Sequence, residues 1–146
     1  MSTSLSPYLS LTGNAREALE FYRTVFGGEV NISTFGESGM DGVPAEGVMH
    51  GELRAADIDL MASDRPGSMP VTPGDSVTLA LTGTDSEKLH TYWDRLADGA
   101  TIGEPLAKAP WGDEYGQLVD RFGFAWMVDI YEDDEGEDTA EIADED

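Results

Sequence analysis

Cysteine is absent from the 146-residue chain, and lysine and arginine together number only eight. Because the chain has no thiol, it can form no disulfide, no thiolate zinc site and no cysteine nucleophile. No run of apolar residues approaches the roughly 18 to 20 that a membrane-spanning helix needs. Residues 1–7 also lack the basic and apolar segments of a secretory signal. We therefore expect a soluble, cytoplasmic protein.

Acidic residues dominate the charge, with 30 Asp and Glu and a net charge of −22. Residues 132–146 hold ten of these acids and no base, and are expected to form a mobile tail. A field of this sign repels nucleic acid and anionic lipid, so neither is an expected partner. The acidity is also typical of proteins that work in concentrated salt; an ordinary acidic protein with a solubilising tail is the alternative.

The first strand and helix are readable from periodicity. Residues 7–13 alternate between apolar and polar side chains, which predicts a half-buried strand. Asn14 and Glu17 have capping-box spacing at the start of an apolar stripe that ends before Gly27 and Gly28. A strand followed by a helix is the expected local structure.

The same pattern recurs seventy residues later. Leu9 and Leu11 correspond to Leu79 and Leu81, and Asn14 corresponds to Thr84, another good N-cap residue. Each helix is followed by three strand-like runs: residues 29–35, 48–55 and 58–63 in the first half, and residues 101–108, 115–119 and 124–131 in the second. The chain is therefore predicted to be duplicated, with a βαβββ pattern in each half and a Pro- and Gly-containing linker at residues 65–75.

Several segments resemble the PhnB-like, glyoxalase/bleomycin resistance branch of the vicinal oxygen chelate superfamily. They are residues 7–9, 13–22, 25–28, 49–53, 60–64, 111–112, 120–123 and 126–128. The resemblance implies an α+β fold in which tandem βαβββ modules form a curved mixed sheet with a concave cleft. It gives a single domain over residues 1–131, with modules at residues 5–64 and 76–131.

Strand alternation predicts which side chains face the helices and which face the cleft. Core-facing residues on the last strand of each half are expected to be Leu60, Ala62, Trp126, Val128 and Ile130. In metal-dependent relatives, four inward strand residues hold one divalent cation. The resemblance maps those positions onto Tyr8, Met61, Thr78 and Met127.

This set contains no imidazole or carboxylate, so it is a poor ligand set for common divalent ions. We expect no metal and no cofactor. Two methionines on facing modules would instead give an adaptable apolar floor for an organic ligand, or would simply fill the core.

His50 and Glu52 are the first candidates for chemistry. Alternation along this strand places Val48, His50 and Glu52 on one face and Met49 and Leu53 on the other. His50 and Glu52 are therefore expected to point into the cleft. The two could be a base and its orienting carboxylate, two groups that orient a ligand, or a structural, solvated pair.

The remaining cleft residues follow from parity and from one loop. Inward positions are Ser10, Ser63, Gln117 and Asp129, while Trp111 and Tyr115 belong to a loop that could cover the cleft. Trp111 could equally fill a dimer interface. The expected ligand-contacting set is Tyr8, Ser10, His50, Glu52, Met61, Ser63, Thr78, Trp111, Tyr115, Gln117, Met127 and Asp129.

Our preferred interpretation is a metal-free, homodimeric PhnB-like protein that binds a small organic molecule in a cleft lined by Met and aromatic residues. The alternative is a metal-dependent lyase, isomerase or dioxygenase acting on a small oxygenated substrate, with a displaced site at His50 and Glu52 and either Asp129 or Gln117. A purely structural module is a third class. Methyl transfer finds no support, because no glycine-rich nucleotide loop follows the first strand.

Overall fold

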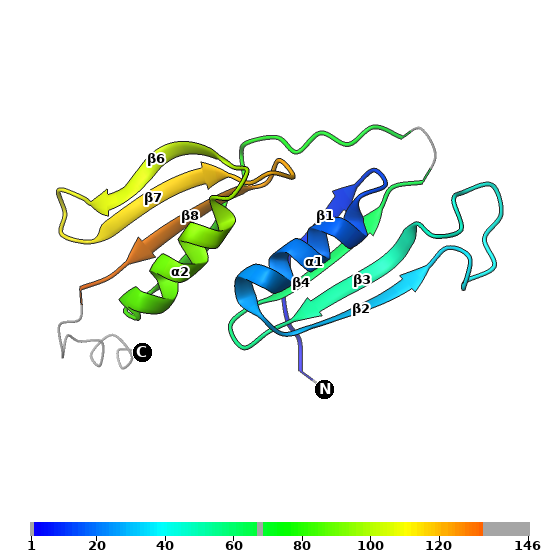
Figure 1. The fold of residues 1–146 in the computed structure, drawn as a ribbon, viewed down its shortest axis with the longest axis horizontal. Coiled ribbons are helices and arrows are strands. Elements are labelled where there is room, and N and C mark those ends of the chain that lie inside the picture. The colour runs from blue at the N-terminus through cyan, green and yellow to red at the C-terminus, as the bar shows by residue number, and fades with distance from the viewer. Residues whose placement is uncertain (1, 67–68, 133–146) are drawn as a thin grey trace. The chain divides into compact units, whose positions relative to one another are not determined.

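The computed structural model describes residues 2–66 and 69–132. It contains two compact units that divide between Pro73 and Gly74. Each unit is a four-stranded mixed sheet with one helix on one face (Figure 1). The α+β class and the βαβββ order of each half are thereby confirmed. Of the predicted acidic tail, all but Glu132 lies outside the described residues.

Unit 1 consists of β1 (Tyr8–Leu11), α1 (Ala15–Phe26), β2 (Glu29–Thr34), β3 (Val48–Arg54) and β4 (Asp59–Asp64). The strand order is β1-β4-β3-β2, with β1 parallel to β4 and the other pairs antiparallel. The parallel pairing of β1 with β4 follows from the helix and the two further strands that separate them in sequence.

Unit 2 repeats this plan with β5 (Leu79–Gly83), α2 (Ser86–Leu96), β6 (Thr101–Lys108), β7 (Glu114–Val119) and β8 (Ala125–Ile130). The strand order is β5-β8-β7-β6, again with a single parallel pair, β5 and β8. The bounds of the strands agree with the predicted runs to within one or two residues.

The core of each unit lies between its helix and one face of its sheet. The residues predicted to face the helices on the last strands are buried, as predicted: Leu60, Ala62, Trp126, Val128 and Ile130. Leu9 and Leu11 are also buried, while Leu79 and Leu81 are half-buried. We call the opposite face of each sheet, which its helix does not cover, the open face.

The start of α1 differs from the prediction. Asn14 is the N-cap residue, but its side chain makes no capping hydrogen bond. The carboxylate of Asp64, at the end of β4, accepts hydrogen bonds from the backbone amides of Gly13 (2.7 Å), Ala15 (2.9 Å) and Val48 (2.9 Å). One buried carboxylate thus joins the β1–α1 turn, the start of β3 and the end of β4, and it accepts from the first amide of α1, where the Asn14 side chain makes no capping hydrogen bond.

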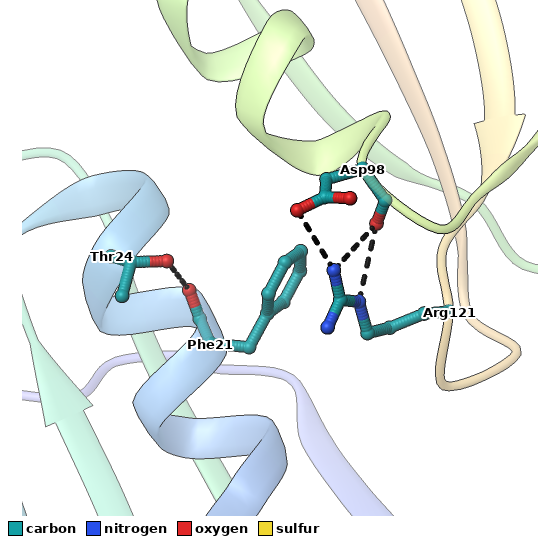
Figure 2. A network of polar contacts seen from close by, with 4 residues as sticks. All are labelled: Phe21, Thr24, Asp98 and Arg121. Carbon is teal, nitrogen blue, oxygen red and sulfur yellow. Dashed lines mark hydrogen bonds and ion pairs between the residues drawn. The ribbon is translucent and has the colours of Figure 1, made fainter.

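The helix of unit 2 begins one residue later than predicted. Asp85, rather than Thr84, is the N-cap residue, and its side chain accepts from the amide of Lys88 at 3.1 Å. The residues after the other end of α2 are joined to the β7–β8 turn, where the Arg121 guanidinium donates to the Asp98 carbonyl and pairs with its carboxylate at 3.0 Å (Figure 2). In unit 1, Figure 2 shows a local contact within α1, from the Thr24 hydroxyl to the Phe21 carbonyl at 2.6 Å.

A register shift between Ser33 and Thr34 changes the start of β3. Val48 was predicted to share a face with His50 and Glu52, but it is 1% exposed and belongs to the core. A β-bulge places one extra residue in one strand of the pair, so the alternation of side chains between the two faces of the sheet is interrupted there. Beyond the bulge the prediction holds, with Leu53 buried on the helix side.

Candidate functional site

The open face of unit 1 carries two adjacent cross-strand rows of side chains. The register places Tyr8, Met61, Glu52 and Asn31 in one row and Ser10, Ser63, His50 and Ser33 in the next. Residues opposite one another on paired strands share a face, so all eight project from the same side of the sheet. This face is polar, and Met61 is the one large apolar side chain among the eight.

Tyr8 and His50 meet diagonally on this face. The Tyr8 hydroxyl lies 3.3 Å from His50 Nδ1, and the ring centroids are 5.8 Å apart. Tyr8 is 50% exposed, so the pair is accessible to a ligand. A phenol beside an imidazole can donate or accept hydrogen bonds and can exchange a proton, because a neutral imidazole has one donor and one acceptor nitrogen.

Glu52 is engaged with its own neighbours rather than with His50. Its carboxylate accepts from Arg54 Nε at 3.0 Å, and it also shares a hydrogen bond with the Asp59 carboxyl. The hydrogen bond from Arg54 holds the pKa of Glu52 below its usual value. Burial, followed by the nearby Glu52, raises the pKa of Asp59, and Asp59 Oδ1 is buried without a hydrogen-bond partner. The predicted pairing of Glu52 with His50 as base and orienting group is therefore not the arrangement observed.

The open face of unit 2 has a different register from the one assumed for the metal positions. Ser10 pairs with Ser63 in unit 1, and the corresponding Ala80 pairs with Met127 in unit 2. Met127 therefore corresponds to Ser63, not to Met61, and the two methionines are not equivalent positions. Thr78 is exposed and precedes β5.

Three of the predicted ligand-contacting residues meet in one pocket of unit 2. The pocket has a volume of about 310 Å³ and is lined by Glu104, Pro105, Ala107, Lys108, Ala109, Pro110, Trp111, Tyr115 and Gln117. Register pairs Glu104 with Gln117 and Ala107 with Tyr115, and the register shift between these two pairs leaves Pro105 outside the regular pairing of β6 with β7. The Trp111 and Tyr115 rings are in edge-to-face contact, with 5.8 Å between their centroids. Trp111 is 63% exposed.

Asp129 lies next to this pocket, opposite Tyr115 on β7. Burial, and then a hydrogen bond to the Asp113 carboxyl at the end of the pocket loop, raises the pKa of Asp129. Its Oδ1 is buried without a hydrogen-bond partner. This hydrogen bond between the two carboxyl groups joins β8 to the loop that carries Trp111.

A larger pocket lies in unit 1, and none of the predicted site residues lines it. Its volume is about 800 Å³, and it is lined by residues of the β1–α1 turn, the first turns of α1, the β2–β3 loop and the end of β4. Arg16, Glu17 and Glu46 are among its charged residues. The glycine-rich β2–β3 loop has no periodic pattern, so no local pattern indicated this pocket.

The described ranges, 2–66 and 69–132, contain no group of three or more His, Asp or Glu side chains arranged to hold a metal ion. Tyr8 and Met61 are cross-strand neighbours, and neither is an imidazole or a carboxylate. Across the same ranges, no helix is long and apolar enough to cross a membrane.

Residues 3–129 match the family described as 3-demethylubiquinone-9 3-methyltransferase. Protein YjdN of Escherichia coli K12 is 30% identical over 140 residues, which covers 86% of this chain and 94% of YjdN. The solved structure of protein PA1353 from Pseudomonas aeruginosa is 31% identical, with a TM-score of 0.81 over 90% of this chain and all of that one.

Two solved structures with lower identity share the fold. A PhnB protein from Bacillus cereus, described as a putative 3-demethylubiquinone-9 3-methyltransferase, is 23% identical with a TM-score of 0.69, covering 88% of this chain and all of that one. A glyoxalase/bleomycin resistance protein/dioxygenase family enzyme from Burkholderia phytofirmans is 15% identical with a TM-score of 0.56, covering 84% and 95% of the two chains. The fold predicted from the duplicated sequence pattern is therefore confirmed.

Proposed function

The chain belongs to the 3-demethylubiquinone-9 3-methyltransferase family, the PhnB-like branch of the glyoxalase/bleomycin resistance fold, and we propose that it binds a small organic molecule without a metal ion. The observation that carries the proposal is the convergence of Trp111, Tyr115 and Gln117 on one pocket. The fold hosts many activities, so the proposal is argued from these side chains and not from the family's name.

The lining of the pocket suits a molecule that is mainly apolar and has a few hydrogen-bonding groups. Trp111 and Tyr115 offer aromatic surface, and the prolines and alanines add apolar walls. Gln117 and the Tyr115 hydroxyl can fix the orientation of a polar group. A volume of about 310 Å³ is at the small end of ligand pockets, which favours a ligand of one or two rings.

The donor set supports binding without a metal. Tyr8, Met61 and Thr78 offer a phenol, a thioether and a hydroxyl, and Met127, one row away from the position equivalent to Met61, offers a second thioether. All are weak ligands for common divalent cations in water. Calorimetric titration of the purified protein with Zn²⁺, Ni²⁺, Mn²⁺ and Fe²⁺ tests this part of the proposal. No saturable heat is expected, and tight one-to-one uptake of any of the four would overturn it.

A metal-dependent enzyme with a displaced site at His50 is less well supported. Glu52 already accepts from Arg54 and hydrogen-bonds with Asp59, and His50 contacts Tyr8. Metal analysis of protein purified without chelator separates the two functions. A metal retained by the parent protein and lost in His50→Ala would favour the enzyme, whereas no retained metal in either protein supports the binding function.

The name of the family describes methyl transfer, but the chain has no glycine-rich nucleotide loop after β1. We propose that methyl transfer is not its activity. Calorimetry with S-adenosylmethionine is expected to give no binding, and saturable binding would contradict this.

A homodimer and a cytoplasmic location are part of the same proposal. Light scattering coupled to size-exclusion chromatography is expected to give twice the mass of the chain, which is 15.7 kDa. The mass of a single chain would overturn the proposed homodimer, but it would not affect the proposed ligand pocket.

The binding function itself is tested by a fragment titration. Nitrogen-15-labelled protein is titrated with one- and two-ring aromatic fragments, and the indole N–H signal of Trp111 is followed by NMR. The described tryptophans Trp93 and Trp126 are 8% and 1% exposed, so their indole signals serve as internal references.

Several fragments are expected to shift the Trp111 signal saturably and to lose most of their affinity in Trp111→Ala. Tyr131→Ala is the matched control, because it removes an exposed aromatic residue of unit 2 that does not line the pocket. Fragment binding that is unchanged in Trp111→Ala, or the absence of any shift across the fragment set, would overturn the proposal.

A further inference from the structure

The larger pocket of unit 1 plays no part in the function proposed above. Its volume is about 800 Å³, within the range of pockets that hold small organic molecules. It lies where the parallel strands β1 and β4 both end, beside the start of α1. Its walls come from residues 12–20, from the β2–β3 loop and from residues 64–66, so segments distant in sequence form it together.

A buried carboxylate holds these three segments together. Asp64 is 6% exposed and accepts hydrogen bonds from the backbone amides of Gly13, Ala15 and Val48 at 2.7, 2.9 and 2.9 Å. The three bonds fix the pocket walls before any ligand arrives, which lowers the entropic cost of binding. They also compensate the charge of Asp64, so this carboxylate is part of the frame of the pocket.

The other charges of the lining are of both signs. Glu20 is paired with Arg23 of the same helix at 2.8 Å. The remaining charged lining consists of two guanidinium groups and two carboxylates: Arg16, Arg65, Glu17 and Glu46. In the part of the chain that the structure describes, no ion pair joins these guanidinium groups to these carboxylates. Arg65 Nη1 donates to the Pro70 carbonyl at 2.7 Å, which leaves its other N–H groups for a ligand.

The rest of the lining is apolar or neutral. Phe35 and Val48 are buried and form apolar floor, and Pro44 and Pro66 add apolar surface. Asn14 also lines the pocket, and its side chain makes no capping hydrogen bond to α1. An amide group at this position suits a peptide-like polar group. The lining therefore combines apolar surface, a neutral amide and charges of both signs.

We propose that this pocket binds a zwitterion of dipeptide size, whose carboxylate contacts Arg16 and Arg65 and whose ammonium group contacts Glu46. A ligand of one charge sign would be attracted by half of these groups and repelled by the other half, whereas a zwitterion is attracted by both halves. The inference goes beyond the function proposed above, because this pocket lies in the other unit and shares no lining residue with the pocket at Trp111.

The test compares L-alanyl-L-leucine with two derivatives that each lose one charge. The N-acetyl form keeps only the carboxylate, and the C-terminal amide keeps only the ammonium group. Each is titrated into full-length nitrogen-15-labelled protein, and the backbone amide signals of Gly13 and Gly47, both in the lining, are followed by NMR. Gly99 and Gly103 of unit 2 serve as reference signals.

The dipeptide is expected to bind about tenfold more tightly than either derivative, the size of one hydrogen bond to a charged group. Its dissociation constant should be roughly millimolar for a ligand of this size, so it is lost during purification.

Two full-length variants assign each charge of the ligand to its partner. Arg16→Gln is expected to weaken the dipeptide several-fold and to shrink its advantage over the amide, because a partner of the carboxylate is lost. Its advantage over the N-acetyl form should persist. Glu46→Gln should have the reverse pattern. Both residues are exposed, so we expect both variants to fold as the parent protein does.

Two further variants are matched controls. Arg54→Gln removes an exposed guanidinium group on the open face of unit 1, and Glu37→Gln removes an exposed carboxylate from the β2–β3 loop. Neither residue lines the pocket, and both variants should bind the three probes as the parent protein does.

Four results would overturn the inference: no saturable shift of Gly13 or Gly47, equal affinity for the three probes, tighter binding of a derivative, or unchanged affinity differences in both Arg16→Gln and Glu46→Gln. None of them affects the function proposed for unit 2, which is measured at the Trp111 indole. Likewise, failure of the aromatic fragments at Trp111 would leave this inference standing. Loss of the Gly13 and Gly47 shifts in Trp111→Ala would show that the two sites are not separate and would also overturn it.

Discussion

The two units build the same sheet but place side chains of opposite size beneath their helices. By register, Ala62 and Gly51 of unit 1 correspond to Trp126 and Leu118 of unit 2. In unit 1, α1 contacts β2, β3 and β4, and Leu19 lies directly against the Gly51 backbone. In unit 2, α2 contacts β5 and β8, and the Trp93 ring lies directly against the Gly116 backbone. The repeated βαβββ fold therefore tolerates small side chains at these two positions in unit 1 and large ones in unit 2, while in both units one helix side chain lies against a strand glycine.

The open faces differ in how they compensate an acid pair. In unit 1, Arg54 binds the Glu52 member of the pair with Asp59. In unit 2, the pKa of Asp129 is raised by burial and by Asp113, and no cation is among the causes. Unit 1 thus pairs one of its two acids with a cation, whereas unit 2 combines an acid pair with an aromatic pocket. The comparison favours the open face of unit 2 over that of unit 1 for ligand binding.

The largest loss of stability is expected when Trp126 is shortened, because this large side chain has only an alanine as its counterpart in unit 1. Trp126→Ala removes a residue that is 1% exposed and whose indole N–H donates to Asp120 at 2.8 Å. We expect the free energy of unfolding to fall by about 3 to 5 kcal/mol, as for other buried aromatic deletions. Chemical denaturation measures it. Trp126→Phe, which keeps a ring but loses the N–H, should cost about 1 to 2 kcal/mol. Equal costs for the two variants would contradict the packing account.

Unit 1 depends instead on the buried carboxylate of Asp64. Asp64→Ala leaves three backbone amides without their acceptor and is expected to cost about 3 kcal/mol. Asp64→Asn keeps one acceptor oxygen and should lie between the parent protein and Asp64→Ala. Urea unfolding at neutral pH gives the ranking, and a cost below about 1 kcal/mol for Asp64→Ala would show that the three hydrogen bonds are not the main organiser of the turn.

Adding a methyl group at Gly51 tests the close approach directly. Its Cβ would overlap with Leu19 Cδ1, so Gly51→Ala is expected to cost about 1 to 3 kcal/mol. Gly103→Ala in unit 2 is the matched control, because its Cβ would meet only the Gln117 carbonyl at 3.7 Å. We expect the control to change stability by less than about 0.5 kcal/mol. If both variants behave alike, the packing of Leu19 against Gly51 does not constrain that position.

Charge is the property in which the two units are alike. Residues 1–73 and residues 74–131 each contain ten acids and four bases, a net charge of −6, and the remaining acids lie in residues 132–146. Screening should therefore stabilise both units, and we expect multimolar KCl to raise the midpoint of thermal unfolding by roughly 5 °C. Calorimetry in low and high KCl measures this. No gain with salt would remove the proposal that the protein is adapted to a concentrated-salt environment.

The smallest effect is expected from the acid pair of unit 2. The raised pKa of Asp129 means that the native protein holds a proton which the unfolded chain releases near the ordinary value of 3.8. Stability should therefore fall as pH rises from that value through the higher native pKa. Asp129→Asn, which cannot ionise, should remove this fall and be slightly more stable than the parent at neutral pH. Urea midpoints across the acidic range check it, and a parallel pH dependence in parent and variant would contradict it.

Periodicity predicted the elements because the helices and strands follow simple alternation. The stripe from Ala15 to Phe26 and the alternating leucines at Leu9 and Leu11 fold as expected. The prediction of capping by Asn14 was wrong, because the acceptor comes from Asp64, which is remote in sequence. A tertiary contact of this kind leaves no local signal.

The open faces were predictable only where the strands are regular. The bulge at Ser33 and Thr34 placed Val48 on the face opposite to the predicted one. Met127 lies one row away from its predicted position, because alternation gives the face of a residue but not its register. The pocket at Trp111 was partly predictable, since aromatic residues in a loop beside a strand favour ligand contact. Glu104, which also lines this pocket, was missed because β6 has the pattern of an exposed edge strand.

The most direct test of the binding function is native mass spectrometry of gently purified parent protein and Trp111→Ala. We predict that the parent retains an organic molecule of small mass, seen as an added mass per chain that mild activation releases, and that Trp111→Ala loses it. An added mass that corresponds to a divalent metal ion, or an organic adduct equally retained by Trp111→Ala, would contradict the account.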